Sequence, residues 1–206
     1  MKSPLHYQIS DYDCGPTSML NAISFLFERE DVPPEIIRNI MLYCLDCYSL
    51  EGIPGKSGTS CAAMMFLSNW LEGIGEIGLL PISCRYLNGQ CVCMGRESLV
   101  NDALHRGGAV VVRVFYDEWH YVLLTGERNG TVLLFDPYYR EEAFPQPDIQ
   151  LTAEHPFQYN RMVPAAYMNR DEESLYAFGP AGTREAILLF NKETELTANK
   201  TIEYFI

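Results

Sequence analysis

The sequence predicts an α+β fold, in which helices come first and an antiparallel β-sheet follows. Three observations indicate this. Apolar residues recur at helical spacing through the first half of the chain. Runs rich in β-branched and aromatic residues follow between residues 109 and 137, and the pair Asn129-Gly130 separates the last two runs as in a tight hairpin. Consecutive helices followed by consecutive strands are typical of the α+β class.

Helices are expected in four places. The first runs from Cys14 to about Glu28, where apolar side chains repeat at helical spacing. The second begins at "PPEII", with Pro34 in the first turn, where its missing N–H costs nothing. Thr59 or Ser60 caps the third, "CAAMMFLSNWLEGIG", which ends on glycines. The fourth lies near "ESLVNDALHRGG".

The expected strands are "PISCRYL", "AVVVRVFY", "HYVLLTGE" and "TVLLFDP". The pattern weakens after about residue 141. There "MVPAAYMN", "SLYAFG", "EAILLFNK" and "TIEYFI" are compatible with edge strands, and "TREAILLFNK" also with a short helix. We therefore expect a core over residues 1–145, and a C-terminal extension over residues 146–206 that packs on the same domain.

Composition and charge narrow the class of protein. A formal net charge of −12 argues against nucleic-acid binding, which needs clustered Lys and Arg, and it would attract basic partners. No apolar run is long enough for a membrane span, and "MKSPLHYQISDYDC" lacks the apolar region of a secretory signal. We therefore expect a cytoplasmic protein. Nothing in the sequence specifies its oligomeric state.

The chain has seven cysteines, an odd number that indicates free thiols rather than a disulfide framework. Cys44 and Cys47 form a C-x-x-C within a predicted helix and lie on one of its faces. Zinc would need two further ligands, and Cys91 and Cys93, one residue apart, are a poor second pair. We therefore expect no metal and no cofactor, and interpret these cysteines as small buried hydrophobes.

Cys14 stands at the start of the first expected helix, in "YQISDYDCGPTSMLNAI". Its sulfur would lie near the unsatisfied N–H groups and the positive end of the helix dipole, which favour the nucleophilic thiolate. Gly15 would allow a tight turn and leave the sulfur open to approach, and Pro16 fits the first turn. The alternative is ordinary turn chemistry at a helix start. Asp13 is interpreted as a helix-entry residue.

A nucleophilic cysteine needs a base that is held by a third group. His120 is the best candidate, because "EWHYVLLTG" places it at the start of a strand, whereas the other three histidines lie in less ordered contexts. With a turn at Asn129-Gly130, His120 would face approximately Tyr139. Asp136, at the end of the adjacent strand, would then be close enough to orient the imidazole. A surface histidine and a turn-forming Asp-Pro is the alternative.

Gln8 completes a possible catalytic set. Attack on a carbonyl creates an oxyanion, and the Gln8 amide together with the Cys14 backbone N–H would stabilise it if the intervening loop folds back. A solvated loop glutamine is the ordinary alternative. The ordered set Gln, Cys, His, Asp is much less frequent by chance than each residue alone.

The blocks "QISDYDCGPTS", "HYVLLTG" and "FDPYY" resemble the papain-like cysteine peptidases, in particular the bacteriocin-processing, or double-glycine leader, peptidases. The resemblance covers roughly residues 5–145. It implies a papain-like fold with helices packed on an antiparallel sheet. It also implies roles for four residues: Gln8 for the oxyanion, Cys14 as nucleophile, His120 as general base and acid, and Asp136 as orienter.

Members of that family are often fused to the membrane and ATP-binding regions of a transporter, which this chain lacks, so a stand-alone form is expected. The expected function is a cysteine peptidase acting on a peptide or protein, by the resemblance after small residues or Gly-Gly in leader peptides. Two alternatives remain: a thiol-dependent acyl or peptidyl transferase on the same fold, and a non-catalytic peptide-binding module.

Overall fold

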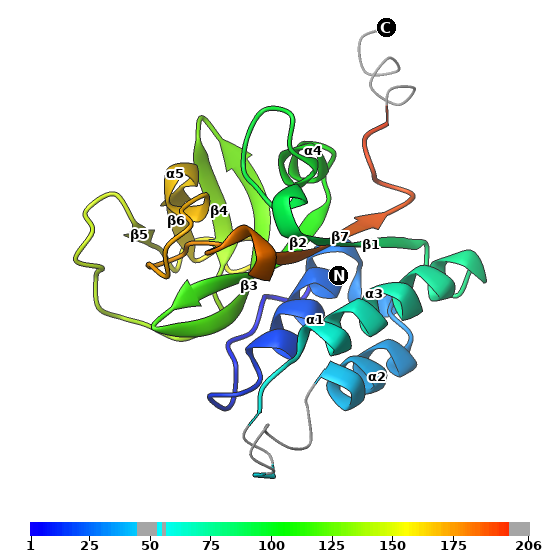
Figure 1. Ribbon diagram of the computed structural model, residues 1–206. Coiled ribbons are helices and arrows are strands. Elements are labelled where there is room, and N and C mark those ends of the chain that lie inside the picture. Colours follow the sequence, from blue (N-terminus) through cyan, green and yellow to red (C-terminus); the bar gives the residue numbers. More distant parts are fainter. Residues whose placement is uncertain (45–52, 55–56, 198–206) are drawn as a thin grey trace, which may run out of the picture.

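The computed structural model describes residues 1–44, 53–54 and 57–197. Five α-helices accompany a seven-stranded antiparallel sheet in this part of the chain, which confirms the α+β class (Figure 1). The helices are α1 Cys14–Leu26, α2 Pro34–Cys44, α3 Cys61–Glu76, α4 Leu99–His105 and α5 Ala165–Met168. The strands are β1 Ile82–Asn88, β2 Ala109–Tyr116, β3 Glu118–Arg128, β4 Thr131–Phe135, β5 Gln150–Leu151, β6 Arg161–Pro164 and β7 Glu185–Asn191.

The helices begin where their sequences predict. Helix α2 starts at Pro34, and Ser60 is the N-cap of α3, with its side chain accepting a hydrogen bond from the Ala63 N–H. Ser98 caps α4 in the same way, through the Asn101 N–H. Residue 47, half of the C-x-x-C motif, lies outside the described residues, as does the expected strand "TIEYFI". Cys44 is buried as expected, but Cys91 is exposed and Cys93 is partly exposed, so the interpretation of that second pair as buried hydrophobes is wrong.

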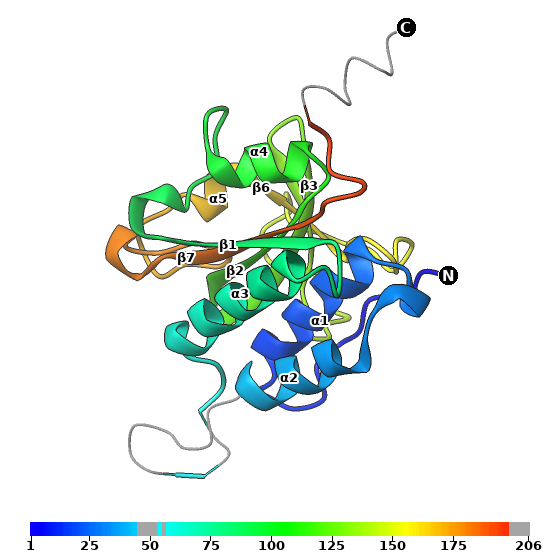
Figure 2. The same cartoon turned by 90° about the vertical axis from the view of Figure 1, so that its right-hand side faces the viewer.

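The sheet separates two apolar cores (Figure 2). Helices α1, α2 and α3 cover one face, and α4 and α5 cover the other. Alternate residues of each strand point to opposite faces, so Leu123 packs toward α1 while Val122 and Leu124 pack toward α4. Within the described ranges, none of the helices combines the length and apolar character that a bilayer crossing requires.

The β3–β4 hairpin has the predicted turn. Asn129 and Gly130 have positive φ values of 51° and 79°, and Arg128 pairs with Thr131 across the turn. The register shifts between Leu124 and Gly126, where a β-bulge interrupts the ladder. The paired part of β4 ends at Phe135, so the predicted facing of His120 and Tyr139 does not occur as a ladder pair.

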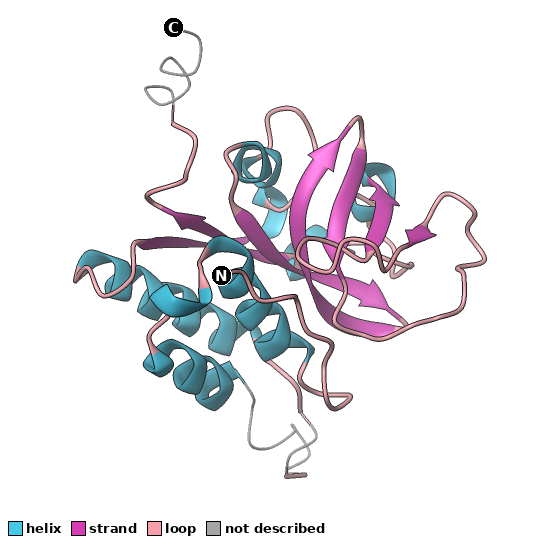
Figure 3. Cartoon of the chain, turned by 180° about the vertical axis from the view of Figure 1, so that it is seen from behind, coloured by secondary structure: helices cyan, strands magenta, loops and turns pink. Residues whose placement is uncertain are grey.

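The segment after residue 145 contributes three strands to the same sheet, whose order is β1-β7-β2-β3-β4-β6-β5. Strand β7, in "EAILLFNK", lies between β1 and β2, so this run is neither an edge strand nor a helix. Every residue of β7 is buried, because both faces of the sheet are covered there. Figure 3 shows the same sheet from behind. The run "SLYAFG" forms no strand, but two backbone hydrogen bonds join it to β2. The Phe115 N–H donates to the Ala177 carbonyl, and the Tyr176 N–H donates to the Phe115 carbonyl.

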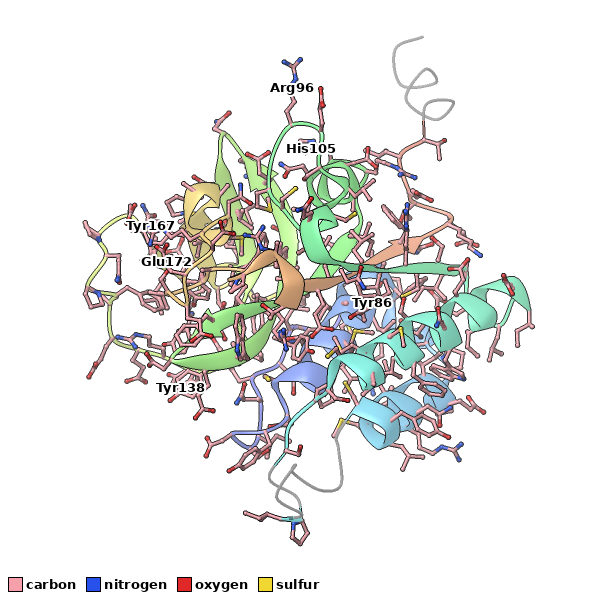
Figure 4. All side chains as sticks on the ribbon, in the orientation of Figure 1. Tyr86, Arg96, His105, Tyr138, Tyr167 and Glu172 are labelled. Atoms are coloured by element: carbon pink, nitrogen blue, oxygen red, sulfur yellow. The ribbon has the colours of Figure 1, made fainter. Side chains whose placement is uncertain are left out.

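A buried carboxylate fixes β7 in the sheet. Glu185, 2% exposed, accepts hydrogen bonds from Tyr86 of β1 at 2.8 Å and from Tyr121 of β3 at 2.6 Å. Tyr86 is labelled in Figure 4, where β1 crosses above α3. Each of the two tyrosine hydroxyls has a charged acceptor, so the polar groups of this interior cluster are satisfied. The cluster therefore specifies which strands β7 joins.

Candidate active site

Cys14 is the first residue of α1, as predicted, and is 8% exposed. The amides of this first turn have no intrahelical acceptor and point toward the preceding loop, so the sulfur lies at the positive end of the helix dipole. Asp13 occupies the N-cap position, and its backbone carbonyl accepts from the Thr17 N–H. The local structure therefore provides the environment that the sequence predicts for a nucleophilic thiol.

The carboxylate of Asp13 does not cap the helix but organises the loop before it. Its oxygens accept hydrogen bonds from the backbone N–H groups of Ile9 and Ser10 at 3.0 and 2.7 Å, and from the Ser10 hydroxyl at 2.8 Å. Burial raises the pKa of Asp13, but these hydrogen bonds outweigh it and leave the pKa below its usual value. The loop between Gln8 and Cys14 is thus folded back by a charged acceptor at its centre.

Gly15 serves close packing rather than access to the sulfur. A Cβ at this position would lie 2.7 Å from the Cβ of Thr59 and even closer to its hydroxyl oxygen. The entrance to α3 therefore packs directly against the first turn of α1. The φ of Gly15 is not in the left-handed region, so it is the contact with Thr59, and not the backbone conformation, that favours glycine here.

Ser18 joins α1 to the strand that carries the histidine. It lies one helical turn after Cys14, and its hydroxyl donates to the carbonyl oxygen of Tyr121 at 3.0 Å. Tyr121 directly follows His120 in β3. A single buried hydrogen bond therefore fixes the position of the helix start relative to the histidine.

His120 and Asp136 form a buried pair. The Nε2 atom of His120 lies 2.8 Å from Oδ1 of Asp136, and the two residues are 8% and 0% exposed. The Asp136 carboxylate thus accepts a hydrogen bond from the Nε2–H group and sets the orientation of the ring. The sequence-based pairing of these two residues is realised, although the ladder between β3 and β4 stops short of them.

The electrostatic environment keeps the imidazole protonated. Burial lowers the pKa of His120, but the charge of Asp136, the hydrogen bond to it and a hydrogen bond with Cys14 together raise the pKa to about 10. Burial likewise raises the pKa of Asp136, but His120 and the charge of Arg161 outweigh it and lower the pKa. The arrangement therefore favours an imidazolium between the Asp136 carboxylate and the Cys14 sulfur.

Three residues that the sequence did not reveal surround Asp136. The Tyr176 hydroxyl donates to Oδ2 of Asp136 at 2.8 Å. The Asn160 side chain bonds both the backbone N–H and the carbonyl of Asp136, each at 2.8 Å. Arg161, 2% exposed, donates to the carbonyls of Asn160 and Tyr138. These contacts bring segments that are distant in the sequence to Asp136. The local sequence patterns of "FQYNRMVP" and "SLYAFG" do not predict them.

Gln8 reaches the site because its loop docks on the turn after Asp136. The Gln8 backbone N–H donates to the Pro137 carbonyl at 2.9 Å, and its side-chain Nε2 donates to the Ser10 carbonyl at 2.8 Å. An amide nitrogen carries two hydrogens, so the second remains available to a ligand. The Gln8 Oε1 atom is buried and has no partner within the described part of the chain.

One cavity of about 370 Å³ contains Gln8, Cys14 and His120 in its lining. The rest of the lining comes from the Gln8–Cys14 loop, the β2–β3 turn and the turn after β4: Asp11, Tyr12, Tyr116, Asp117, Glu118, Trp119 and Tyr138. The structure therefore brings all four predicted residues together, three of them on the cavity and Asp136 directly behind His120. Among the described residues, no group of His, Cys, Asp and Glu is arranged to bind a metal ion.

No protein-family model matches the chain, and no curated protein matches its sequence. Inference about function therefore rests on the geometry of these side chains. Their arrangement supplies a thiol at a helix N-terminus, a charged imidazole beside it, a buried carboxylate behind the imidazole and an amide at the rim.

Proposed function

We propose that the protein is a cysteine peptidase with a papain-like arrangement, in which Cys14, His120 and Asp136 act as a triad and Gln8 assists. The observation that carries the proposal is the position of His120, bonded to Asp136 at 2.8 Å and interacting with Cys14 at the wall of a cavity. A histidine between a thiol and a carboxylate is what nucleophilic acyl transfer requires.

The proposed reaction has two stages. Cys14 Sγ attacks the peptide carbonyl, and the imidazolium of His120 gives its proton to the leaving amine, which leaves a thioester on Cys14. Neutral His120 then removes a proton from water, which attacks the thioester and releases the acid product. The free N–H of Gln8 and the Cys14 backbone N–H are the donors that would stabilise the oxyanion in both stages.

The proposed substrates are peptides. The resemblance of "QISDYDCGPTS", "HYVLLTG" and "FDPYY" to double-glycine leader peptidases suggests small residues before the scissile bond. A papain-like fold is supported by helix α1, which starts at Cys14 and packs on strand β3, and by the antiparallel sheet that carries His120 and Asp136.

Alkylation combined with peptide cleavage tests this function. The protein is treated with an iodoacetamide probe and with a library of peptides that contain Gly-Gly, beside the variants Cys14→Ala and His120→Ala. We expect preferential labelling of Cys14 that depends on His120, and cleavage that both variants abolish. Matched labelling of exposed Cys61 and Cys91 provides the internal reference.

Labelling spread evenly over the cysteines, unaffected by His120→Ala, would contradict the catalytic assignment. Labelled Cys14 without hydrolysis, but with product formed when an amine acceptor is added, would assign the chain as a transferase instead. Binding of peptides without hydrolysis and without transfer to an amine would indicate a non-catalytic peptide-binding module.

A further inference from the structure

The cavity beside Cys14 is lined by carboxylates whose oxygens have no partner among the described residues. Asp11, Asp117 and Glu118 belong to its lining, and all three are exposed. Within the described chain, none of their side chains forms a hydrogen bond or an ion pair. The described lining contains no lysine or arginine to neutralise them. Their charges therefore act on whatever enters the cavity.

The carboxylates come from two separate loops that face the same space. Asp11 lies in the loop that the buried Asp13 folds back. Asp117 is the residue between β2 and β3, and Glu118 is the first residue of β3. Asp117 has a φ of 60°, a left-handed conformation that side chains other than glycine adopt infrequently. Tyr116 and Glu118 pair across this turn, so the sheet fixes the backbone that carries Asp117 and Glu118.

Aromatic rings form the remaining wall. Tyr12, Tyr116, Trp119 and Tyr138 line the cavity together with the carboxylates. Trp119 is held in place by Arg113, whose guanidinium lies 4.8 Å from the ring centroid, and Tyr138 packs on Tyr116 at 5.6 Å. Carboxylates combined with aromatic faces bind organic cations through charge and cation–π attraction.

We propose that this cavity selects peptides with a lysine or arginine side chain close to the scissile bond, with Asp11, Asp117 and Glu118 as the specificity-determining residues. The inference rests on the proposed peptidase function, because it treats the cavity at Cys14 as the substrate site. The net charge of −12 acts in the same direction over longer distances, since it raises the encounter rate of a cationic peptide.

Peptide binding to the Cys14→Ala variant tests the selectivity without requiring turnover. Three fluorescent peptides share a central Gly-Gly and differ only in flanking lysines, norleucines or glutamates. We expect the lysine peptide to bind about tenfold more tightly than the norleucine peptide. This factor is the combined effect of three exposed charge interactions, each of them modest. The preference should weaken as salt is added, because exposed charges are screened.

The variant Asp11→Asn/Asp117→Asn/Glu118→Gln removes the charges while keeping the side-chain shapes. Asparagine also tolerates the left-handed conformation of residue 117, so the turn is retained. The matched control is Glu35→Gln/Glu76→Gln/Glu97→Gln, which changes net charge equally outside the cavity lining. Figure 4 shows Arg96, the neighbour of Glu97, at the top of the molecule and the cavity residue Tyr138 well below it, at the lower left.

The lysine preference should disappear in the cavity variant and persist in the control. Equal binding of the lysine and norleucine peptides, no binding of the lysine peptide, or a preference that survives in the cavity variant would each overturn this proposal. Charge-selective binding by a protein that labels no cysteine selectively and cleaves nothing would overturn the proposed function alone. Cleavage without charge selectivity would overturn only the specificity.

Discussion

The aspartate behind the imidazole is held from several sides. Asp136 receives hydrogen bonds from the Tyr176 hydroxyl and the Tyr138 N–H, and its backbone is clamped by Asn160. A carboxylate with this many donors stays charged although it is fully buried, since hydrogen bonds to the charged form offset the cost of desolvation. The Asp136 carboxylate therefore orients His120, and its own position is fixed by these hydrogen bonds.

The pH dependence of two reactions at Cys14 should differ. With its pKa raised to about 10, His120 keeps the proton that the leaving amine needs, so hydrolysis should fall as the pH rises through about 10. Alkylation by iodoacetamide needs only the thiolate and should not fall there. Both rates are measured from pH 6 to about 11, within the limits where circular dichroism shows an intact fold. Parallel loss of both rates would contradict a general-acid role for His120.

The same pair contributes to folding stability. The folded-state pKa of His120, about 10, lies above the ordinary value of 6.5, so its pairing stabilises the fold fully below about pH 6.5 and is lost as the pH rises through about 10. Asp136→Asn removes the anion and should flatten this dependence. Urea unfolding of both proteins at a series of pH values measures the effect, and an unchanged dependence in Asp136→Asn would count against the pairing.

Removal of the Tyr176 hydroxyl should destabilise the protein. Tyr176→Phe withdraws one donor from a fully buried carboxylate, which typically costs about 1–3 kcal/mol. Tyr167→Phe makes the same chemical change at the exposed Tyr167–Asp148 hydrogen bond and should alter stability little. Equilibrium unfolding in urea compares the two variants. Equal effects would show that the bond to Asp136 adds nothing beyond an exposed contact.

At the scale of elements, the thiol and the imidazole are aligned by helix packing. Helix α1 is anchored to β3 by Ser18, and its first turn is in direct contact with the start of α3 at Thr59. Both contacts lie within one turn of Cys14. A shift of either helix would therefore move the sulfur relative to His120.

Gly15→Ala tests the contact between the two helix starts. The new methyl group would overlap the Thr59 side chain, so we expect destabilisation of about 1–3 kcal/mol and slower alkylation of Cys14. Adding Thr59→Gly removes the atoms that clash and should recover part of the loss. The control, Gly73→Ala in α3, meets no atom within 4 Å and should stabilise the helix by about 0.5–1 kcal/mol. Thermal unfolding and alkylation rates measure these effects, and a neutral Gly15→Ala would contradict the packing.

The whole molecule depends on a strand that is late in the sequence but interior in the sheet. Strand β7 pairs with both β1 and β2, and Glu185 at its start accepts hydrogen bonds from two tyrosines of other strands. Among the described strands, β1 is thus hydrogen-bonded to the sheet only through β7.

Truncation after residue 180 should abolish folding. It removes β7, leaves Tyr86 and Tyr121 without their buried acceptor and separates β1 from β2. Truncation after residue 197 retains every strand of the described sheet and should leave the cooperative transition in place. Circular dichroism and thermal unfolding distinguish the two. A cooperative transition in the shorter protein would show that residues 1–180 fold without β7.

The sequence predicts the local parts of this molecule better than its long-range pairings. The helix start at Cys14, the cap at Ser60 and the turn at Asn129-Gly130 depend on backbone preferences of neighbouring residues, and the structure has all three. The interior place of β7 depends on contacts with strands far away in the chain, because a fully buried run has no periodicity that distinguishes edge from centre.

The same division holds within the candidate site. Gln8, Cys14, His120 and Asp136 are recognisable from local context and resemblance, and the structure brings them together. The residues that support Asp136 cannot be recognised from the sequence, because tertiary packing alone brings Tyr176 and Arg161 to it. Asp13 was recognised as a helix-entry residue, but its carboxylate organises the loop before the helix.

The interior position of β7 also has a consequence for the order of events during synthesis. Ribosomes deliver the chain from its N-terminus, so β1 and β2 emerge well before the strand that must lie between them. If β1 paired directly with β2, the strand edges that β7 needs for its own hydrogen bonds would already be occupied. The nascent chain must therefore keep these two strands apart. The sheet is completed only when β7 arrives and brings Glu185 to Tyr121, the neighbour of His120 in β3.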